Sequence, residues 1–213
     1  MIKVLTIERE YGSGANEIAQ KVSDRLGWKL WDQLLTTEIA RQMECDKRHV
    51  EQREECRDPL YYRMFKSFLR GSFEGSLNTH RLKLADAEGI RTVTEQLVRQ
   101  AAKEGNCVIV GRGSAYYLHD SPDVFNVFVY APFDEKVRRI QQSGKSEQEA
   151  TELADTVDQD RAEFIKHCFG VEWPARDYFH LMINSGVGDE AAVETILNAV
   201  NVFEKANPLS RVS

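Results

Sequence analysis

The stretch IKVLTIEREYGSGANEIA, residues 2–19, decides the fold of this chain. Its first six residues form a nearly continuous apolar run, which predicts a buried strand. A glycine-rich turn follows, and then a helix that opens on small residues. In α/β proteins this arrangement holds phosphates, because the N–H groups at the helix start point at the anion and the glycines let the backbone approach closely.

The loop nevertheless lacks the Lys and the Ser/Thr of a complete Walker A motif. Aligned with G-x-x-x-x-G-K-[ST], the chain places Arg9 at the first Gly, Gly14 at the second, Ala15 at the Lys and Asn16 at the Ser/Thr. The backbone pattern therefore favours phosphate binding, whereas the missing side chains argue against a standard NTPase.

The composition is typical of a globular protein in water. The chain has 213 residues, of which 29% are charged and 42% hydrophobic. A net charge of −6 argues against a nucleic-acid binder, whose footprint would be a basic surplus. The N-terminus shows no secretory pattern, and no apolar run approaches the roughly 18 residues of a membrane span. We therefore expect a cytoplasmic protein with no nucleic-acid or membrane partner. The sequence does not specify the number of subunits.

The cysteines and histidines do not predict a metal site. No C-x-x-C pair occurs, so we expect reduced thiols, with one of them in the core at the start of a strand (Cys107). The residues concerned are scattered along the chain: Cys45, Cys56, Cys107, Cys168, His49, His80, His119, His167 and His180.

Further strands and helices alternate along the chain. Short apolar runs bounded by turn residues predict strands buried on both faces, and apolar spacings of three or four predict helices. The predicted strands after the first are Lys29–Trp31, Cys107–Val110, Val124–Tyr130 and Leu181–Ile183. The predicted helices are Glu17–Leu26, Val93–Ala102, Val137–Ile140 and Ala192–Val202. The order β-α-β-insert-α-β-α-β-α-α-β-α implies an α/β fold, a parallel sheet with helices on both faces.

Two stretches interrupt this alternation, residues 36–90 and residues 144–176. Most of their charges fit ordinary surface helices. Two lobes at the carboxyl end of a sheet would also suit an enzyme that encloses a reactive phosphate and excludes water. We expect one domain over residues 1–213, with a core of about 1–35, 91–143 and 177–205.

Short motifs occur along the chain in a definite order. They are REYGSG at residues 9–14, LGW at 26–28 with WD at 31–32, VIVGR at 108–112, AP at 131–132 with RRI at 138–140, DQDR at 158–161, and Trp173 with residues 178–185. Together they resemble the cytidylate kinase-like branch of the P-loop nucleoside monophosphate kinases. The resemblance runs from residue 2 to about residue 200, and residues 36–90 match least.

The resemblance implies a P-loop kinase fold with a five-stranded parallel sheet. It also implies an ATP and Mg²⁺ site at the glycine loop, a lobe for the nucleoside monophosphate in 36–90 and an arginine-bearing lid in 144–176. True cytidylate kinases carry the loop Lys, and the cytidylate kinase-like branch generally lacks it. That branch usually has Gly-Gly-Arg where this chain has Gly14, Ala15 and Asn16, so the departure concerns catalysis more than fold.

The donor nucleotide is assigned to the loop and the first helical turn. The alternative is a tight turn without a ligand, because a lone Gly-x-Gly is common. Glu17 would favour the helix dipole but repel a phosphate, so it either points away or holds Mg²⁺ between itself and the phosphates. The residues assigned are Gly12, Ser13, Gly14, Ala15, Asn16 and Glu17.

Arg9 is a catalytic candidate at the end of the first strand. It can supply the positive charge that Ala15 lacks, or it can pair with Glu8 or Glu10 as a structural residue. Both interpretations stay open at this point.

Two residues are assigned to the acceptor. Asp32 follows the second strand, where the resemblance places acceptor contacts, although it could instead cap a helix near Leu34. Arg112 follows Gly111 at the carboxyl end of a strand, where α/β sheets bind ligands. Its planar guanidinium suits a phosphate, because it can engage two oxygens at once.

Arg139 and Arg161 are the catalytic candidates of the lid, since they match the family pattern. An arginine that closes over the transferring phosphoryl group stabilises charge in the transition state. Arg138 is expected to be a surface charge, and Asp158 can pair with Arg161 at i, i+3. The remaining motif residues are expected to pack or to form a turn: Trp173, Tyr178, Phe179 and Asn184–Gly186.

The predicted function is phosphoryl transfer from ATP to a nucleoside monophosphate, CMP or dCMP, assisted by Mg²⁺. One rival is a non-catalytic nucleotide-binding protein. Ala15 favours that rival, and Arg112, Arg139 and Arg161 speak against it. A second rival is a kinase for another small acceptor, since residues 36–90 would choose the acceptor and a fold does not decide this.

Overall fold

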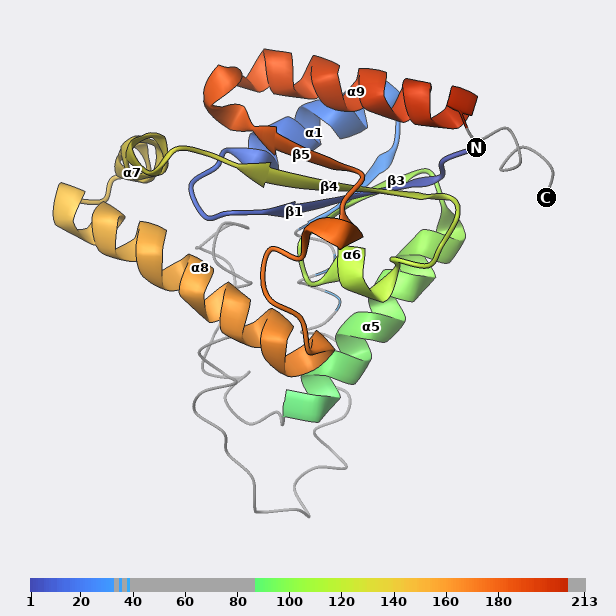
Figure 1. Cartoon of the computed structure of the whole chain (residues 1–213), viewed down its shortest axis with the longest axis horizontal. Coiled ribbons are helices and arrows are strands. Elements are labelled where there is room, and N and C mark those ends of the chain that lie inside the picture. Colours follow the sequence, from blue (N-terminus) through green and yellow to red (C-terminus); the bar gives the residue numbers. More distant parts are fainter. Residues whose placement is uncertain (33–34, 36–37, 39–86, 207–213) are drawn as a thin grey trace.

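The computed structural model describes residues 1–32, 35, 38 and 87–206 (Figure 1). Within this part of the chain one sheet has the strand order β2-β3-β1-β4-β5. Every pairing in the sheet is parallel, which confirms the predicted fold class. The strands are β1 Val4–Arg9, β2 Lys29–Trp31, β3 Cys107–Val110, β4 Val124–Tyr130 and β5 Leu181–Asn184.

Strand β1 lies at the centre of the sheet and has no solvent-facing side. All six of its residues are buried, including the charged pair Glu8 and Arg9 at its end. Val4 lies opposite Cys107 of β3 on one side and opposite Val124 of β4 on the other. The segments that follow β1, β3 and β4 therefore leave the sheet at the same edge, where ligands of open α/β sheets bind.

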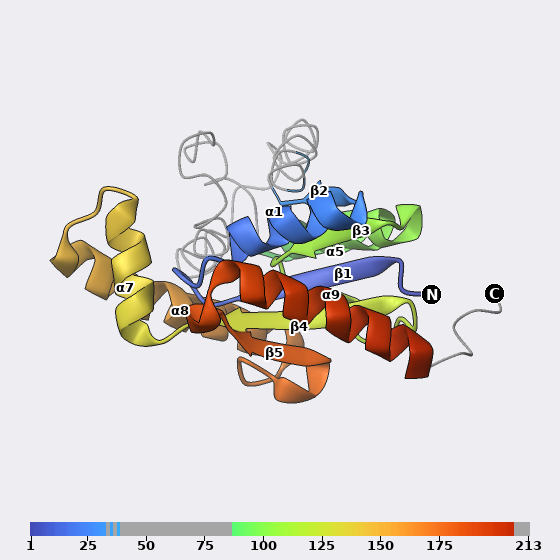
Figure 2. The ribbon, with the colours of Figure 1, turned by 90° about the horizontal axis from the view of Figure 1, so that it is seen from above.

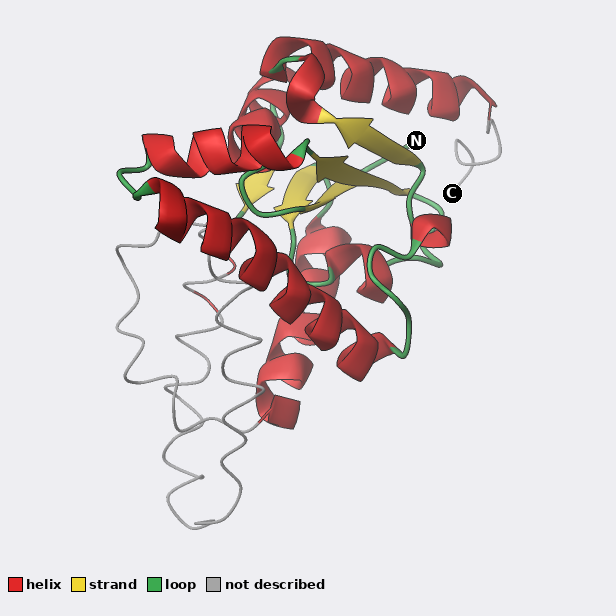
Figure 3. Cartoon of the chain, turned by 60° about the vertical axis from the view of Figure 1, so that its left-hand side comes forward, coloured by secondary structure: helices red, strands yellow, loops and turns green. Residues whose placement is uncertain are grey.

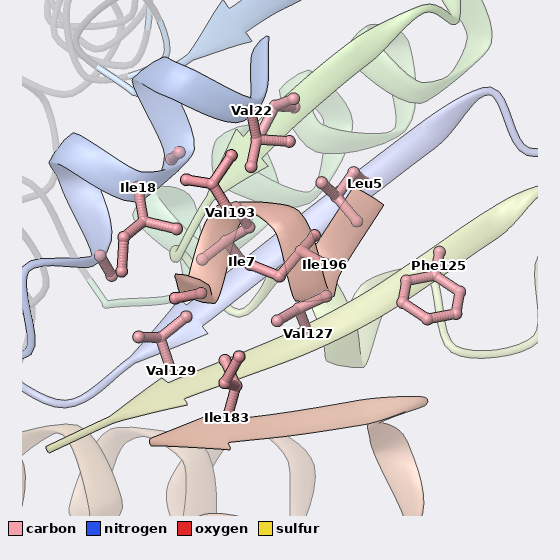
Figure 4. Packing of buried hydrophobic residues seen from close by; sticks show 14 of the residues in the cluster. Leu5, Ile7, Ile18, Val22, Phe125, Val127, Val129, Ile183, Val193 and Ile196 are labelled. Atoms are coloured by element: carbon pink, nitrogen blue, oxygen red, sulfur yellow. The ribbon is translucent and has the colours of Figure 1, made fainter. Parts of the chain in front are cut away.

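Helices cover both faces of the sheet. On one face α1 (Ala15–Leu26) and α9 (Asp189–Ala206) lie side by side (Figure 2). On the other face lie α5 (Ala87–Glu104) and the short α6 (Ser114–Tyr117). Full burial of an aliphatic side chain contributes about 1.5–3 kcal/mol, so these layers hold the sheet. Figure 4 shows the first layer, which includes Leu5, Ile7, Ile18, Val22, Val127, Val193 and Ile196.

Two helices form a hairpin, here called the arm, that starts beyond the carboxyl ends of the strands, and its second helix then runs beneath the sheet toward α5 (Figures 1 and 3). It consists of α7 (Phe133–Gln142) and α8 (Glu147–Phe169). A capping box begins α8: the Glu149 N–H donates to Ser146 Oγ, and the Ser146 N–H donates to the Glu149 carboxylate. Most of the second insert is thus α8. The two helices and the loop pack on one another through Tyr11, Ile140, Ala150, Ala154 and Val157.

The first insert lies outside the described residues, apart from residue 38 and the start of α5. Leu35 and Glu38, in the helix expected near Leu34, are helical, while residues 33–34 and 36–37 lie outside the described residues, so the acceptor lobe and a capping role for Asp32 stay predictions. The three aromatic residues after α8 pack against the core beneath β4, which confirms their expected packing role: Trp173, Tyr178 and Phe179.

Cys107 is buried as the first residue of β3, as predicted, and burial raises the pKa of its thiol to about 12. Cys107 and Cys168 are both free thiols. Across the described ranges, no group of three or more His, Cys, Asp and Glu residues could hold a metal ion. No helix in these ranges is long and apolar enough to cross a membrane.

Candidate active site

The glycine loop turns sharply between β1 and α1. Gly12 and Gly14 have φ values of +76° and +73°, a region that side chains with a Cβ rarely adopt. The Ser13 hydroxyl donates to the Glu10 carbonyl at 2.8 Å and closes the turn. No side chain of the described residues caps α1 at Gly14. The first N–H groups of α1 therefore lack a side-chain acceptor at the position where the sequence predicts an anion.

Two side chains from distant segments hold this loop in place. The Tyr11 N–H donates to Oδ1 of Asp158 on α8 at 2.8 Å. Ser185, fully buried after β5, donates its hydroxyl to the Ser13 carbonyl at 2.6 Å. The turn expected at Asn184–Gly186 is present, since the Gly186 N–H donates to Oδ1 of Asn184. Sequence reasoning did not find that this turn also supports the glycine loop, through Ser185.

A cavity of about 440 Å³ opens beside the loop. All six predicted donor-site residues line it, together with the three predicted catalytic arginines. Arg112 and Asp32 are not among its lining residues. The lining is Arg9, Glu10, Tyr11, Gly12, Ser13, Gly14, Ala15, Asn16, Glu17, Arg139, Ile140, Gln142, Ser143, Arg161 and Asp189.

Arg9 is 4% exposed and turns toward β3. A Cβ at Gly111 would overlap its Nη1, so its guanidinium lies against that glycine. Arg9 also counteracts the rise in the pKa of Glu8 that burial causes. These contacts place Arg9 on the β3 side of the loop beside Glu8, and Arg9 also lines the cavity.

Arg112 is held in an unusual backbone conformation. Its φ is +64°, between Gly111 at +66° and Gly113 at +71°. A non-glycine residue in this region costs on the order of 1–2 kcal/mol, and such strain clusters at functional sites. The Arg112 residue is 1% exposed. Burial and the positive charge of Arg9 lower the pKa of its guanidinium to about 9, while the negative charge of Asp32 acts to raise it. The structure thus brings Arg112 near Asp32, and their role in binding an acceptor stays a prediction.

Glu8 is the carboxylate at the centre of these arginines. Burial raises its pKa, while the charges of Arg9 and Arg161 oppose that rise. The N–H groups of Ser114 and Ala115, at the start of α6, also donate to it. Sequence reasoning weighed Glu8 only as a partner of Arg9. The sequence signal that it overlooked was a carboxylate directly after the apolar run of residues 2–7.

Arg161 ties α8 to the end of β1. Its Nη1 donates to the Arg9 carbonyl at 2.8 Å and lies 3.4 Å from Asp158, which confirms the expected i, i+3 pair. The side chain is buried, and burial together with the charge of Arg9 lowers its pKa to about 10. Arg161 is therefore the residue of the arm that reaches the buried cluster of Glu8 and Arg112.

Lys136 of α7 is a cation that sequence reasoning did not assign. Its Nζ lies 2.9 Å from Asp158 and 3.3 Å from Glu10. Burial acts to lower its pKa, but these two carboxylates outweigh burial and raise it. Lys136 thus links both helices of the arm to the residue that precedes the loop.

Arg139 lies directly over the loop. Its Nε donates to Glu135 at 2.7 Å and its Nη2 to Asp189, the first residue of α9, at 2.8 Å. A Cβ at Gly14 would overlap its Nη1. The neighbouring Arg138 also binds Glu135, but its side chain is 56% exposed, which confirms it as a surface charge.

The two remaining assigned acids lie at the margins of the site. Glu17 is exposed in the first turn of α1 and lines the cavity. Asp32 is half-buried directly after β2. In this structure Glu17 is thus a helix-start charge that remains within reach of the cavity.

This sheet order, with a glycine loop after the central strand and helices on both faces, defines the class of P-loop kinases. The chain matches the cytidylate kinase-like family over residues 4–187 and belongs to it. The resemblance read from the motifs is therefore confirmed. Membership of this family indicates phosphoryl transfer in general as the chemistry of the site.

Solved structures share the fold at low sequence identity. An uncharacterized protein from Eubacterium ventriosum is 19% identical with a TM-score of 0.65, covering 94% of this chain and 99% of that one. Shikimate kinase from Acinetobacter baumannii, in complex with shikimate, is 14% identical with a TM-score of 0.51, over 95% and 94%. A sugar kinase from Janibacter is 14% identical with a TM-score of 0.52, over 94% and 95%. Among curated proteins no sequence matches the chain.

Proposed function

We propose that this protein transfers the γ-phosphoryl group of ATP to a nucleoside monophosphate, CMP or dCMP, in the cytoplasm. The observation that carries this proposal is the cavity at the uncapped start of α1, lined by Arg9, Arg139 and Arg161. Backbone N–H groups and guanidinium groups that converge on one space fit the phosphates of a nucleotide. Family membership supports the phosphoryl transfer and leaves the acceptor to be tested.

The chain's own groups would act by position and charge. The backbone of Gly12 to Asn16 would hold the donor phosphates, and Arg161 would stabilise charge on the transferring group from the arm. Arg112, supported by Asp32, would hold the acceptor phosphate at the end of β3. In-line transfer of this kind needs no covalent enzyme intermediate.

The acids of the cavity fit a magnesium–nucleotide complex. Mg²⁺ is usually held by one or two carboxylates together with substrate phosphates, and Glu17 and Asp189 both line the cavity. When bound, Mg²⁺ would neutralise charge that develops on the phosphate oxygens.

The lobes of the domain follow from the same proposal. Residues 36–90 would form the acceptor lobe and residues 144–176 the lid of a single domain. Because α7 packs with α8 and touches the loop through Gly12, the moving unit would include Phe133–Gln142 as well. Such an arm could exclude water from the reacting phosphate.

The main alternative is a nucleotide-binding protein without turnover. It is favoured by Ala15, and by the two carboxylates that already bind Arg139. A kinase for a different small acceptor is the other alternative, because the acceptor lobe lies outside the described residues.

A transfer assay separates these three functions. Purified protein is incubated with Mg²⁺–ATP and each nucleoside monophosphate in turn, and ADP formation is measured with and without the acceptor. The proposal expects acceptor-dependent turnover that is greatest with CMP or dCMP. Nucleotide binding without turnover would support the non-catalytic alternative. Turnover with another acceptor class would overturn the assignment of CMP.

A further inference from the structure

We propose that Arg139, supplied by α7, binds the donor phosphates in place of the lysine that the glycine loop lacks. This inference rests on the proposed function, because it concerns the same cavity. The position of the missing lysine is Ala15, whose short side chain is 2% exposed and carries no charge. A cation for the loop must therefore come from another element.

Arg139 is the cation in contact with the loop at this point. Its Nη1 occupies the space in which a Cβ of Gly14 would lie, and its Cζ would be 2.9 Å from that Cβ. Gly14 directly precedes Ala15, so the guanidinium lies beside the first turn of α1. A glycine at position 14 is required for this approach as well as for the positive φ of +73°.

The remaining edges of the guanidinium are anchored. Nε donates to Glu135 and Nη2 donates to Asp189, whereas Nη1 makes no hydrogen bond to any residue that the structure describes. An arginine can do this because its planar group carries five N–H donors in a rigid fork. The anchors thus fix the orientation of Arg139 and leave Nη1 directed at the loop.

The other two arginines of the cavity are committed elsewhere. Arg9 lies against Gly111, on the β3 side. Arg161 donates its Nη1 to the Arg9 carbonyl and lies 3.4 Å from Asp158. Both are almost fully buried, while the Arg139 side chain is 17% exposed beside the first turn of α1.

The two carboxylates that bind Arg139 also lead us to expect that they compete with a bound phosphate for its guanidinium. Arg139 carries one positive charge against the two negative charges of Glu135 and Asp189, and Arg138 shares Glu135. A phosphate that enters the cavity competes with Asp189 for the same guanidinium. Neutralising Asp189 should therefore strengthen the binding of a metal-free polyphosphate, because repulsion falls while Arg139 stays charged.

The test measures the binding of inorganic tripolyphosphate and of ATP, both without metal, by isothermal titration calorimetry. Arg139→Gln should weaken both by at least about tenfold, since a charge-assisted hydrogen bond is lost. Arg138→Gln is the matched control, because it removes a neighbouring charge on the same carboxylate outside the cavity, and it should change affinity by less than about twofold. Asp189→Asn should tighten tripolyphosphate binding.

A rescue makes the test specific. Ala15→Lys in the Arg139→Gln background should regain at least part of the lost affinity. If Ala15→Lys is not tolerated at this buried position, Arg139→Lys serves instead and should bind with intermediate strength. Wild-type affinity in a folded Arg139→Gln variant would overturn the inference and leave the proposed function standing. A parent protein that binds neither tripolyphosphate nor ATP would overturn the proposed function itself. Loss of binding in Arg9→Gln but not in Arg139→Gln would assign the role to Arg9.

Discussion

The two sides of the β1 carboxyl end hold their arginines in opposite ways. On the α1 side Arg139 is partly exposed, bound to two carboxylates and adjacent to a cavity. On the β3 side Arg9 and Arg112 are buried around Glu8, and Arg112 does not line the cavity. A partly exposed ion pair contributes little and exchanges partners readily, whereas a buried charge depends on its partner. Arg139 on the first side can thus exchange a carboxylate for a ligand, whereas the arginines on the second side are held in fixed positions by burial and by Glu8.

The largest effect is expected at the centre of the buried side. Glu8→Gln keeps the shape of the side chain but removes the negative charge among Arg9, Arg112 and Arg161. Breaking one partner of a buried charge cluster costs about 3–5 kcal/mol, so the free energy of unfolding should fall by that order. Urea denaturation measures it.

Glu17→Gln is the control for the charge change, because Glu17 is exposed, and its unfolding free energy should stay within about 0.5 kcal/mol of the parent. If Glu8→Gln is as stable as this control, Glu8 does not hold the buried arginines together.

Kinetics should separate the role of Arg161 from that of Arg112. Arg161→Lys should chiefly lower kcat, by roughly 10²–10³, because the contact of Arg161 would tighten only in the transition state. Arg112→Lys should chiefly raise the acceptor KM, as the loss of uniform binding does. Steady-state rates with the acceptor found in the transfer assay, and with Arg138→Ala as the control, measure both. Unchanged kcat and KM in both variants would leave these arginines with a structural role only.

A matched pair of glycines isolates the contact between the loop and Arg139. Gly14 and Gly170 have φ values of +73° and +72°, so an alanine at either position carries the same strain of about 1 kcal/mol. Only at position 14 would the Cβ meet another group, the guanidinium of Arg139, while nothing lies within 4 Å at Gly170. Gly14→Ala should therefore weaken ATP binding by about tenfold or more, and the bulkier Gly14→Val should abolish it. Thermal shift with ATP measures binding, and equal loss in Gly170→Ala would refute the contact.

A smaller effect is expected where β5 supports the loop. Ser185→Ala removes the donor to the Ser13 carbonyl and leaves that group without its partner, which costs about 1–3 kcal/mol. Ser23→Ala is the control, since Ser23 is equally buried but donates within its own helix, to the Gln20 carbonyl. Both variants should lose stability, but only Ser185→Ala should also lose nucleotide affinity. Equal affinities in the two variants would show that Ser185 does not shape the loop.

The smallest effect should come from a titratable group outside the site. His180 accepts a hydrogen bond at Nδ1 from the Asn126 N–H, and burial lowers its pKa. The unfolded chain then binds a proton first, so stability is complete above about pH 6.5 and falls as the pH drops from there through the lowered folded-state pKa. Chemical denaturation between pH 7.5 and 5 measures this slope, and His180→Gln should flatten it. The nucleotide affinity of the folded fraction should not change with the protonation of His180, because His180 does not line the cavity.

Short-range sequence signals predicted the elements of the fold but not all of the contacts of the site. The run from Val4 to Ile7 indicates a buried strand because every residue in it is apolar or small, and Gly27 does end α1. The role of Ser185 was not predictable in this way, because its acceptor lies 172 residues away. Lys136 also looked like an ordinary helix-surface charge, and Asp158 like a partner of Arg161 in the same helix. Nothing local showed that Lys136 lies against Glu10 or that Asp158 accepts from the Tyr11 N–H.

The sequence by itself determined the parallel sheet, the glycine loop and the family, because these depend on apolar runs, backbone freedom and motif order, which neighbouring residues specify. Only the tertiary structure decided which arginine serves which side of β1. Arg9 is next to the loop in sequence but turns toward Gly111, while Arg139 reaches Gly14 from α7. The physical reason is that a long side chain settles where its charge finds partners and its bulk finds space. Glu8 provides the charge partner on one side and Glu135 with Asp189 on the other, and the two glycines leave the space that side chains would fill.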